Sequence, residues 1–304
     1  MKLKASTKKI LALSLLVVCA VTLVGCTTPM VTNADGTKTV KLIEAATTFK
    51  DTLSSEDWFS AILVWPMAQV LNYLEPRMGV AAAIAILTLV VNGVLMLATL
   101  KQTVASQQMQ LLQPEMDHIQ RKYEGKTDDA SKMKQANEMQ ALYKKYNVNP
   151  FSMIFITLLQ FPIIIAMYQA VQRASAIKTS TFLGMSLETT PWQGISHFQW
   201  GYLILFIVMG VCQYFSMMIP MMLAKKKAEA DAEKHHRKPE ESKTSSQNKM
   251  MQYYMMAMIM VFGLMWPTAM SIYWTIYSLV NIAKTLLIQK IIEKDAAKKE
   301  GAVE

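Results

Sequence analysis

The sequence has few charged residues. Only 17% of its 304 residues are Asp, Glu, Lys or Arg, while 52% are hydrophobic, and an ordinary soluble domain carries about 25% charged residues. The charges gather in a few segments and leave several uncharged runs long enough to cross a bilayer, which takes about 20 helical residues. These runs do not alternate between apolar and polar residues as the strands of a transmembrane barrel do. We therefore predict an all-α polytopic membrane protein.

Cysteine and histidine are scarce as well, which limits the possible chemistry. The chain has three cysteines and four histidines, too few cysteines for a disulfide framework or a cysteine-rich metal site. The histidines show no ligand spacing, and His235 and His236 are adjacent in a stretch rich in Lys and Glu, where a solvated face is the simpler interpretation. No nucleophile, base and orienting group come together, and no phosphate-binding glycine loop occurs. We expect no enzymatic activity, no metal ion and no cofactor.

The first 25 residues are typical of a targeting signal. Four lysines among the first nine residues precede an apolar stretch from Ile10 to Leu23, as in the charged and apolar regions of a secretory signal peptide. The letters LVGC that end at Cys26 resemble a bacterial lipobox, in which the cysteine is lipidated and the signal is cut just before it. The resemblance implies a lipoprotein signal peptide at 1–25, a lipid on Cys26 and an extracellular tether at 26–57. An uncleaved anchor helix is the alternative.

Five apolar runs qualify as membrane-spanning helices by length and hydropathy. They cover about residues 78–100, 150–172, 198–223, 250–266 and 268–289. A sixth run is shorter and is interrupted by Pro66. We expect this segment, 58–75, to lie flat on the outer membrane surface as an interfacial amphipathic helix, with Ser54 and Asp57 spaced as a capping box at its start. The polar segment 30–53 shows no periodicity and is expected to be a flexible tether.

The distribution of basic residues predicts the orientation of the spans. Segments 101–149 and 224–249 each hold eight Lys or Arg residues, whereas the loop 173–197 holds two. Basic loops stay in the cytoplasm, which agrees with five spans and an outer N-terminus but not with six spans. We therefore expect a multi-pass plasma-membrane protein with a five-span core at 76–290, a lipid anchor on the extracellular face and a cytoplasmic tail at 291–304.

The two basic segments differ in character. The first, 101–149, carries two apolar stripes at helical spacing and predicts a cytoplasmic helical hairpin whose stripes face each other, with a partner site as the alternative role. The second, 224–249, has no apolar stripe and is expected to be a disordered basic cytoplasmic loop. The two stripes of the hairpin are Met109, Leu112, Met116, Ile119 and Tyr123, and then Ala136, Met139, Tyr143 and Tyr146.

Methionine is abundant, with 25 residues in the chain and a dense run from Met250 to Met265. Flexible, polarizable thioethers suit a surface that accepts varied apolar partners. Simple contact with lipid is the alternative interpretation of this run.

Polar side chains inside the spans are costly in lipid and are therefore informative. Asn92 in the first span and Gln160 in the second each lie about 13 to 15 Å from the basic end of their span, at 1.5 Å per residue. In the fifth span, polar and indole side chains recur at steps of three and four and share one face. These three spans predict either a hydrated groove or an interhelical hydrogen-bond network, since both would satisfy the polar atoms. The fifth-span face comprises Ser271, Trp274, Ser278, Asn281 and Thr285.

Several short motifs resemble those of the YidC/Oxa/Alb family of membrane protein insertases, in the same order and at matching spacing over nearly all of 58–290. The first span and the start of the hairpin are similar to that family's T-L-x-x-R-x(4)-P-L-T-x-K-Q and L-Q-P segments, and the last span fits P-x-G-L-x-L-Y-W. The matching residues are Thr88 to Asn92, Thr99 to Gln102, Leu112 to Glu115, Ala141 to Tyr143, Val148 to Pro150, Gln160 to Pro162, and Pro267, Tyr273 and Trp274.

The resemblance implies a five-helix core with a groove that is open to the cytoplasm and to lipid but closed on the outside. Such a groove would contact the polar flank of a nascent membrane protein. The sequence departs from the family where the groove arginine falls at Asn92 and a proline falls at Leu97. Lys284 of the fifth span is a candidate substitute for the missing charge. The candidate substrate-contact residues are therefore Asn92, Gln160, Trp274, Ser278, Asn281 and Lys284.

Two other functions remain as alternatives. A small transporter or channel component would also place polar residues within the membrane, but it predicts inverted repeats or broken helices in matching halves, which this sequence does not show. A scaffold that binds partners through its hairpin and tail is the third possibility. The expected partners are nascent membrane proteins and the bilayer, and no DNA. The basic tail allows contact with a ribosome without requiring it, and the sequence leaves cooperation with the Sec translocon open.

Overall fold

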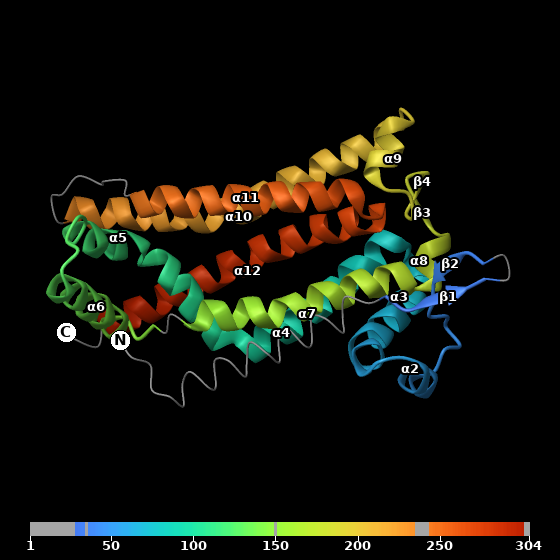
Figure 1. Cartoon of the computed structure of the whole chain (residues 1–304), viewed down its shortest axis with the longest axis horizontal. Helices are drawn as coiled ribbons and strands as arrows, with labels where there is room; N and C mark the ends of the chain where they lie inside the picture. Colours follow the sequence, from blue (N-terminus) through green and yellow to red (C-terminus); the bar gives the residue numbers. More distant parts are fainter. Residues whose placement is uncertain (1–27, 34–35, 149–150, 235–242, 301–304) are drawn as a thin grey trace. The chain divides into compact units, whose positions relative to one another are not determined.

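The computed structural model describes residues 28–33, 36–148, 151–234 and 243–300 (Figure 1). Over these residues the chain is all-α apart from short strands in two antiparallel hairpins. The elements in chain order are β1 (Met30–Thr32), β2 (Lys38–Val40), α2 (Phe49–Ser55), a π-helical segment η1 (Ser60–Val64), α3 (Trp65–Met78), α4 (Val80–Leu111), α5 (Gln113–Lys122), α6 (Asp129–Lys145), α7 (Phe151–Arg173), α8 (Ser175–Thr179), β3 (Thr181–Phe182), β4 (Met185–Ser186), α9 (Pro191–Ser196), α10 (Trp200–Lys234), α11 (Lys243–Met265) and α12 (Thr268–Glu300).

The predicted fold class is confirmed: the protein is a polytopic helical membrane protein. Within the described residues, three helices are long and apolar enough to cross a membrane, over Val80–Leu111, Trp200–Lys226 and Thr268–Lys294. The 23-residue α7 lies where the second span is predicted. The apolar part of α11, Gln252–Met265, lies where the fourth is predicted. Helices therefore occupy all five predicted places.

The contacts divide the chain into two compact units, and each is described by itself. The first unit comprises the chain up to Val90 together with Thr157–Leu205 and Met265–Tyr273. The second unit comprises Val91–Ile156, Phe206–Leu264 and the chain from Trp274 onward.

In the first unit, the segment 58–75 is helical as expected, but with a π-helical turn at η1 that leads into α3. Pro66 lacks a backbone N–H and cannot complete an α-helical hydrogen bond, and a π-turn directly before it accommodates this interruption. Phe59, Val64 and Ala68 are fully buried along one face. Trp65 is half-buried, and its indole N–H donates a 2.9 Å hydrogen bond to a backbone carbonyl of the preceding loop. The placement of this helix at the membrane surface stays a prediction.

The polar segment before this helix is more structured than we expected. We expected a flexible tether at 30–53, but the described residues of this segment include the paired strands β1 and β2 and most of α2. The expected capping box of Ser54 and Asp57 is wrong, because the Ser54 hydroxyl donates to the carbonyl of Asp51. Asp57 alone accepts the N–H of Ser60, at 2.7 Å. The capping box of this region is one helix earlier, where the side chain of Thr48 caps α2.

In the second unit, α5 and α6 form the predicted helical hairpin. Tyr123 of the first predicted stripe is buried, and Leu142 is the buried residue of α6. Ala136, predicted on the second stripe, is exposed, because α6 turns Glu138 toward α5. The Glu138 carboxylate accepts hydrogen bonds from Lys122 at 2.6 Å and from the Tyr123 hydroxyl at 2.8 Å. Polar pairing contributes to this hairpin alongside apolar packing.

Two further helices of the second unit, α10 and α11, approach each other closely at glycines. A side chain at Gly263 of α11 would meet the methyl end of Met209, and one at Gly210 of α10 would meet the methyl end of Met260. The basic segment 224–249, expected to be disordered, is helical at both of its described ends, where it continues α10 and begins α11. Residues 235–242 lie outside the described part of the chain.

Candidate functional site

The polar face of α12 contacts α10 in the second unit. The hydroxyl of Ser278 is buried and donates a 2.7 Å hydrogen bond to Oε1 of Gln213, and Nδ2 of Asn281 donates a 3.0 Å hydrogen bond to Oγ of Ser216. Both pairs are separated by 65 positions in the sequence, so α10 and α12 run parallel here with a constant register. The α10 partners were missed by the sequence analysis. Their spacing of three residues, equal to that of Ser278 and Asn281, was the available signal.

Farther along α12, contacts with α4 take over within the same unit. The side-chain amide of Gln107 on α4 donates to the backbone carbonyl of Thr285 at 3.1 Å and to the side chain of Gln289 at 3.2 Å. Beyond this polar contact, Leu111 of α4 packs with Ile288 and Ile292 of α12 in a buried apolar cluster. Leu223 and Ala224 of α10 pack against the same cluster. The second unit therefore has a polar layer of hydrogen-bonded helices followed by an apolar layer.

Three other predicted site residues also lie in the second unit. Asn92 on α4 is 8% exposed and Trp274 on α12 is 7% exposed. Lys284 of α12 is half-buried, and among the described residues none forms an ion pair or hydrogen bond with its ammonium group. An ionisable side chain within an apolar span is costly and is therefore a candidate functional group.

The two remaining predicted residues are not placed with these five. Gln160 is half-buried on α7 in the first unit, and its proximity to Asn92 stays a prediction. Cys26, the predicted lipidation site, lies outside the described residues.

A second polar site occurs in the first unit around Arg173, the last residue of α7, whose side chain is fully buried. Its guanidinium donates two hydrogen bonds to the Glu56 carboxylate, at 2.7 and 2.8 Å, and a third to the Ser60 hydroxyl at 3.3 Å. Its Nε donates to the backbone carbonyl of Lys41 at 2.9 Å, and the Lys41 ammonium lies 3.1 Å from the same carboxylate. We call these four residues the Arg173 cluster. Both hydrogen bonds to the carboxylate come from one nitrogen, Nη2, and such charge-assisted bonds are about twice as strong as neutral ones.

The backbone beside the Arg173 cluster is held in place as well. The N–H of Ile43 donates to the carbonyl of Arg173 at 2.7 Å, and the carbonyl of Ile43 accepts the N–H of Ser175 at 3.2 Å. The Asn72 side chain donates to the same Ile43 carbonyl at 2.7 Å. The segment 41–47 is thus joined to α3 and to the end of α7. The sequence analysis had treated Arg173 only as a loop charge.

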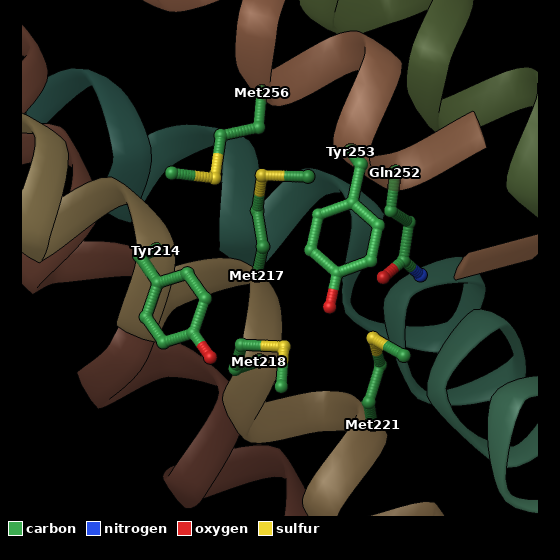
Figure 2. Close-up of a pocket in the computed structure, with 7 residues that line it drawn as sticks. All are labelled: Tyr214, Met217, Met218, Met221, Gln252, Tyr253 and Met256. Carbon is green, nitrogen blue, oxygen red and sulfur yellow. The ribbon is translucent and has the colours of Figure 1, made fainter. Parts of the chain in front are cut away.

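Methionines from α10 and α11 surround a small apolar pocket in the second unit, shown in Figure 2. The side chains of Met217 and Met256 point toward each other from the two helices, and the ring of Tyr253 lies beside them (Figure 2). The dense methionine run of the sequence thus contributes to an interhelical surface. Its complete lining is Tyr214, Met217, Met218 and Met221 from α10, and Gln252, Tyr253 and Met256 from α11.

The described residues contain no group of three or more His, Cys, Asp or Glu side chains that could hold a metal ion. The chemistry that the polar sites offer is hydrogen bonding, ion pairing and solvation. Together with long apolar helices, this arrangement is that of a helical membrane protein whose polar groups pair with one another.

Comparison with known proteins assigns this membrane protein to a family. The family model described as 60Kd inner membrane protein matches residues 73–296. Membrane protein insertase MisCA of Bacillus subtilis is 30% identical over 241 residues, which cover 78% of this chain and 82% of that protein. Membrane protein insertase YidC 2 of Bacillus anthracis is 30% identical over 229 residues, or 74% of this chain and 79% of that protein. The chain belongs to the 60Kd inner membrane protein family, which is the YidC/Oxa/Alb family. The resemblance of the motifs is thereby confirmed.

A streptococcal relative matches over a shorter stretch with higher identity. Membrane protein insertase YidC 1 of Streptococcus pyogenes serotype M1 is 42% identical over 134 residues, which cover 44% of this chain and 48% of that protein. The aligned part of this chain thus spans about half the length of that relative.

Proposed function

We propose that the protein is a membrane protein insertase, which assists the insertion and folding of other integral membrane proteins. The observation that carries the proposal is family membership over residues 73–296, together with relatives named membrane protein insertases, one of which aligns with 78% of the chain. The proposed activity makes and breaks no covalent bond, so it requires no catalytic residue. The partners it implies are nascent membrane proteins and the surrounding lipid.

The physical task of such a protein is to lower the cost of moving polar groups through lipid. Each Asp, Lys or Arg at the centre of a membrane helix costs about 2.5 to 3.5 kcal/mol on an insertion scale. A hydrated groove among the spans would let the polar flank of a client exchange water for protein hydrogen bonds while its apolar segment enters lipid. The residues that we assign to client contact are Asn92, Gln160, Trp274, Ser278, Asn281 and Lys284.

The structure favours client contact for some of these residues more than for others. Ser278 and Asn281 already hydrogen bond to α10, which supports a role in joining the helices. Lys284 is half-buried without an ion-pair partner among the described residues, which supports a role in client contact. A solvent-accessibility scan with single cysteines at positions 92, 160, 278 and 281 tests the groove. Reaction of all four with a water-soluble thiol reagent supports it, and protection of all four would replace it with a purely structural network.

Lys284 is the proposed substitute for the arginine that the family places at Asn92. Its ammonium group would attract acidic client segments, because an ion pair is stronger in a partly dehydrated groove than in water. We expect Lys284→Gln to reduce the insertion of clients with acidic tails and to spare clients with neutral tails. If Lys284→Gln changes neither while Asn92→Arg improves the acidic clients, Lys284 does not have this role.

We further propose the orientation that the basic segments predict, with the hairpin α5–α6 in the cytoplasm and the N-terminus outside, anchored by a lipid on Cys26. The basic residues of the hairpin support this orientation. Protease added to intact spheroplasts should leave the hairpin uncut. Mass spectrometry of the mature N-terminus should find a diacylglyceryl group on Cys26, and an unmodified or uncleaved N-terminus would overturn the anchor.

Depletion of the protein from its host tests the function as a whole. We expect newly made small membrane proteins to remain uninserted and sensitive to protease once the protein is depleted. The uptake of small solutes by transporters that are already in the membrane should continue. The opposite pattern, normal insertion with lost solute uptake, would support a transporter instead.

A further inference from the structure

Four large apolar side chains between residues 183 and 200 are highly exposed, although they lie outside the membrane-spanning part of any helix or at its very start. Their exposed fractions are 84% for Leu183, 63% for Trp192, 78% for Phe198 and 65% for Trp200. We call the segment that carries them, residues 181–200, the aromatic loop. Exposed apolar side chains at this density on one short segment indicate a surface that another phase or molecule covers.

The backbone of the aromatic loop holds two of these side chains outward at a conformational cost. Leu183 has a φ of +50° and Phe198 a φ of +59°. A bulky residue rarely adopts this left-handed conformation, which glycine or asparagine adopts more readily. Strained residues of this kind persist where the surroundings fix them, and they often mark functional positions.

The aromatic loop packs against the first turn of α10. The sulfur of Met185 in β4 lies where a side chain at Gly201 would be. The ring of Tyr202 fills the space over Gly194 of α9, and its hydroxyl donates a 3.1 Å hydrogen bond to the carbonyl of Ser186. The depth of the start of α10 in the membrane therefore determines the depth of the whole loop.

That depth is set by the hydropathy of α10. Trp200 is the first residue of the candidate span Trp200–Lys226, and the first residue of a membrane-spanning helix is expected near the boundary between water and lipid. Between Lys178 and Lys225 the only residue with a formal charge is Glu188, and its carboxylate pairs with the Lys178 ammonium at 3.0 Å. The aromatic loop thus carries one formal charge, which is paired, and its exposed tryptophans are of the kind enriched at membrane–water interfaces.

We propose that the aromatic loop inserts Leu183, Trp192, Phe198 and Trp200 into the bilayer, at the boundary between the lipid headgroups and the acyl chains. The partner is the lipid surface itself. Since the loop carries no unpaired cation among these positions, the insertion does not depend on anionic headgroups. The loop then acts as a neutral anchor that fixes the level of α10 in the membrane.

Fluorescence quenching in proteoliposomes tests the depth of the loop. An environment-sensitive fluorescent amino acid is placed at position 183 or 198 by amber suppression, which leaves the three cysteines of the chain unchanged. The matched controls carry it at Lys38, an exposed polar position on β2, and at Val208, an exposed apolar position within α10. Nitroxide-labelled lipids quench from within the bilayer, and iodide quenches from water.

We expect iodide quenching at 183 and 198 to be several-fold weaker than at 38, and quenching by nitroxides near the headgroups to exceed that by nitroxides near the bilayer centre. The probe at 208 should show the reverse preference among nitroxides. The result should be the same in vesicles of zwitterionic lipid and of anionic lipid. Iodide quenching equal to that at 38 would overturn the proposal. Protection from both iodide and nitroxides would also overturn it, because a protein partner or a second copy would then cover the loop.

A substitution that suits the backbone separates the anchor from the fold. Asparagine tolerates the left-handed conformation, so Leu183→Asn combined with Phe198→Asn should leave the thermal unfolding midpoint in detergent unchanged or higher. In proteoliposomes, the same variant should shift a probe at position 192 toward water, with a measurable increase in iodide quenching. An unchanged depth of the probe would contradict the anchoring role even if the variant folds normally.

Discussion

Removing the charge of Glu56 should release the segment 41–47 from the first unit. The Arg173 side chain is 0% exposed and that of Glu56 is 4% exposed, so Glu56→Gln leaves a buried guanidinium without its counter-charge. Removing one partner of a buried pair typically costs about 3 to 5 kcal/mol. At about 1.4 kcal/mol per tenfold change in an equilibrium constant, local opening should become roughly a hundred- to several-thousand-fold more frequent.

The Lys41 side chain provides a matched control, because it pairs with the same carboxylate but is 34% exposed. Lys41→Gln should cost no more than about 1 kcal/mol, as expected for a partly exposed ion pair. Replacing both members of the buried pair, as Glu56→Gln with Arg173→Met, should cost less than the sum of the single changes, since no buried charge is then left unpaired.

Hydrogen–deuterium exchange of the protein in lipid nanodiscs measures this effect. The N–H groups of Ile43 and Ser175 donate across the junction and report its opening directly. We expect their exchange to rise strongly in Glu56→Gln and weakly in Lys41→Gln. If the two variants exchange alike, the Arg173 cluster does not hold this segment, and its geometry has no large energetic role.

Three further results are expected. Gly194→Ala should lower the free energy of unfolding by about 1 to 3 kcal/mol, because a tyrosine ring of α10 occupies the space of the new methyl group. Gly93 has open space around it, so Gly93→Ala should be neutral or slightly stabilising. A thermal melt in detergent compares the two variants. The pKa of Glu138 is held below its ordinary value by hydrogen bonds from lysine and tyrosine. Its contribution to the stability of the α5–α6 hairpin is therefore complete above about pH 4.3 and is lost as the pH falls through the lowered pKa. Spin-label distances between α5 and α6 should widen on acidification in the wild type, and Glu138→Gln should abolish this pH dependence. A double-mutant cycle of Ser278→Ala and Gln213→Ala should give a coupling of about 0.6 kcal/mol, the average for such membrane hydrogen bonds, and a coupling of zero would contradict the observed contact.

The membrane-spanning helices and the hairpin could be predicted because their signals are local. An uncharged run of about 20 residues has few alternatives to a membrane helix, and the break around Gly125, where φ is +79°, separates two helices of the hairpin. The face of α6 was less accurately predicted. Ala136 fits an apolar stripe by spacing alone, but the hydrogen bonds of Glu138 determine which side of the helix faces α5.

The contacts between distant segments were not predicted, and spacing offered a signal only for the α10 partners of Ser278 and Asn281. Arg173 and Glu56 are separated by 117 positions, and neither belongs to a pattern that indicates the other. Ser278 and Asn281 were correctly placed on one helix face. Their partners on α10 were not identified, because a polar face alone does not say whether it meets water in a groove or side chains of a neighbouring helix. The polar composition of residues 30–53 predicted an irregular chain, whereas long-range hydrogen bonds to α3 and α7 hold part of it in place.

The most direct test of the proposed function is insertion by the purified protein alone. The full-length protein is reconstituted into liposomes, and a small client with one membrane-spanning segment is synthesised in their presence without other membrane proteins. We expect the wild type to give a protease-protected, membrane-integrated client fraction well above that of empty liposomes, with a smaller fraction for Lys284→Gln when the client tail is acidic. A client fraction equal to that of empty liposomes would contradict the proposal that this protein is an insertase.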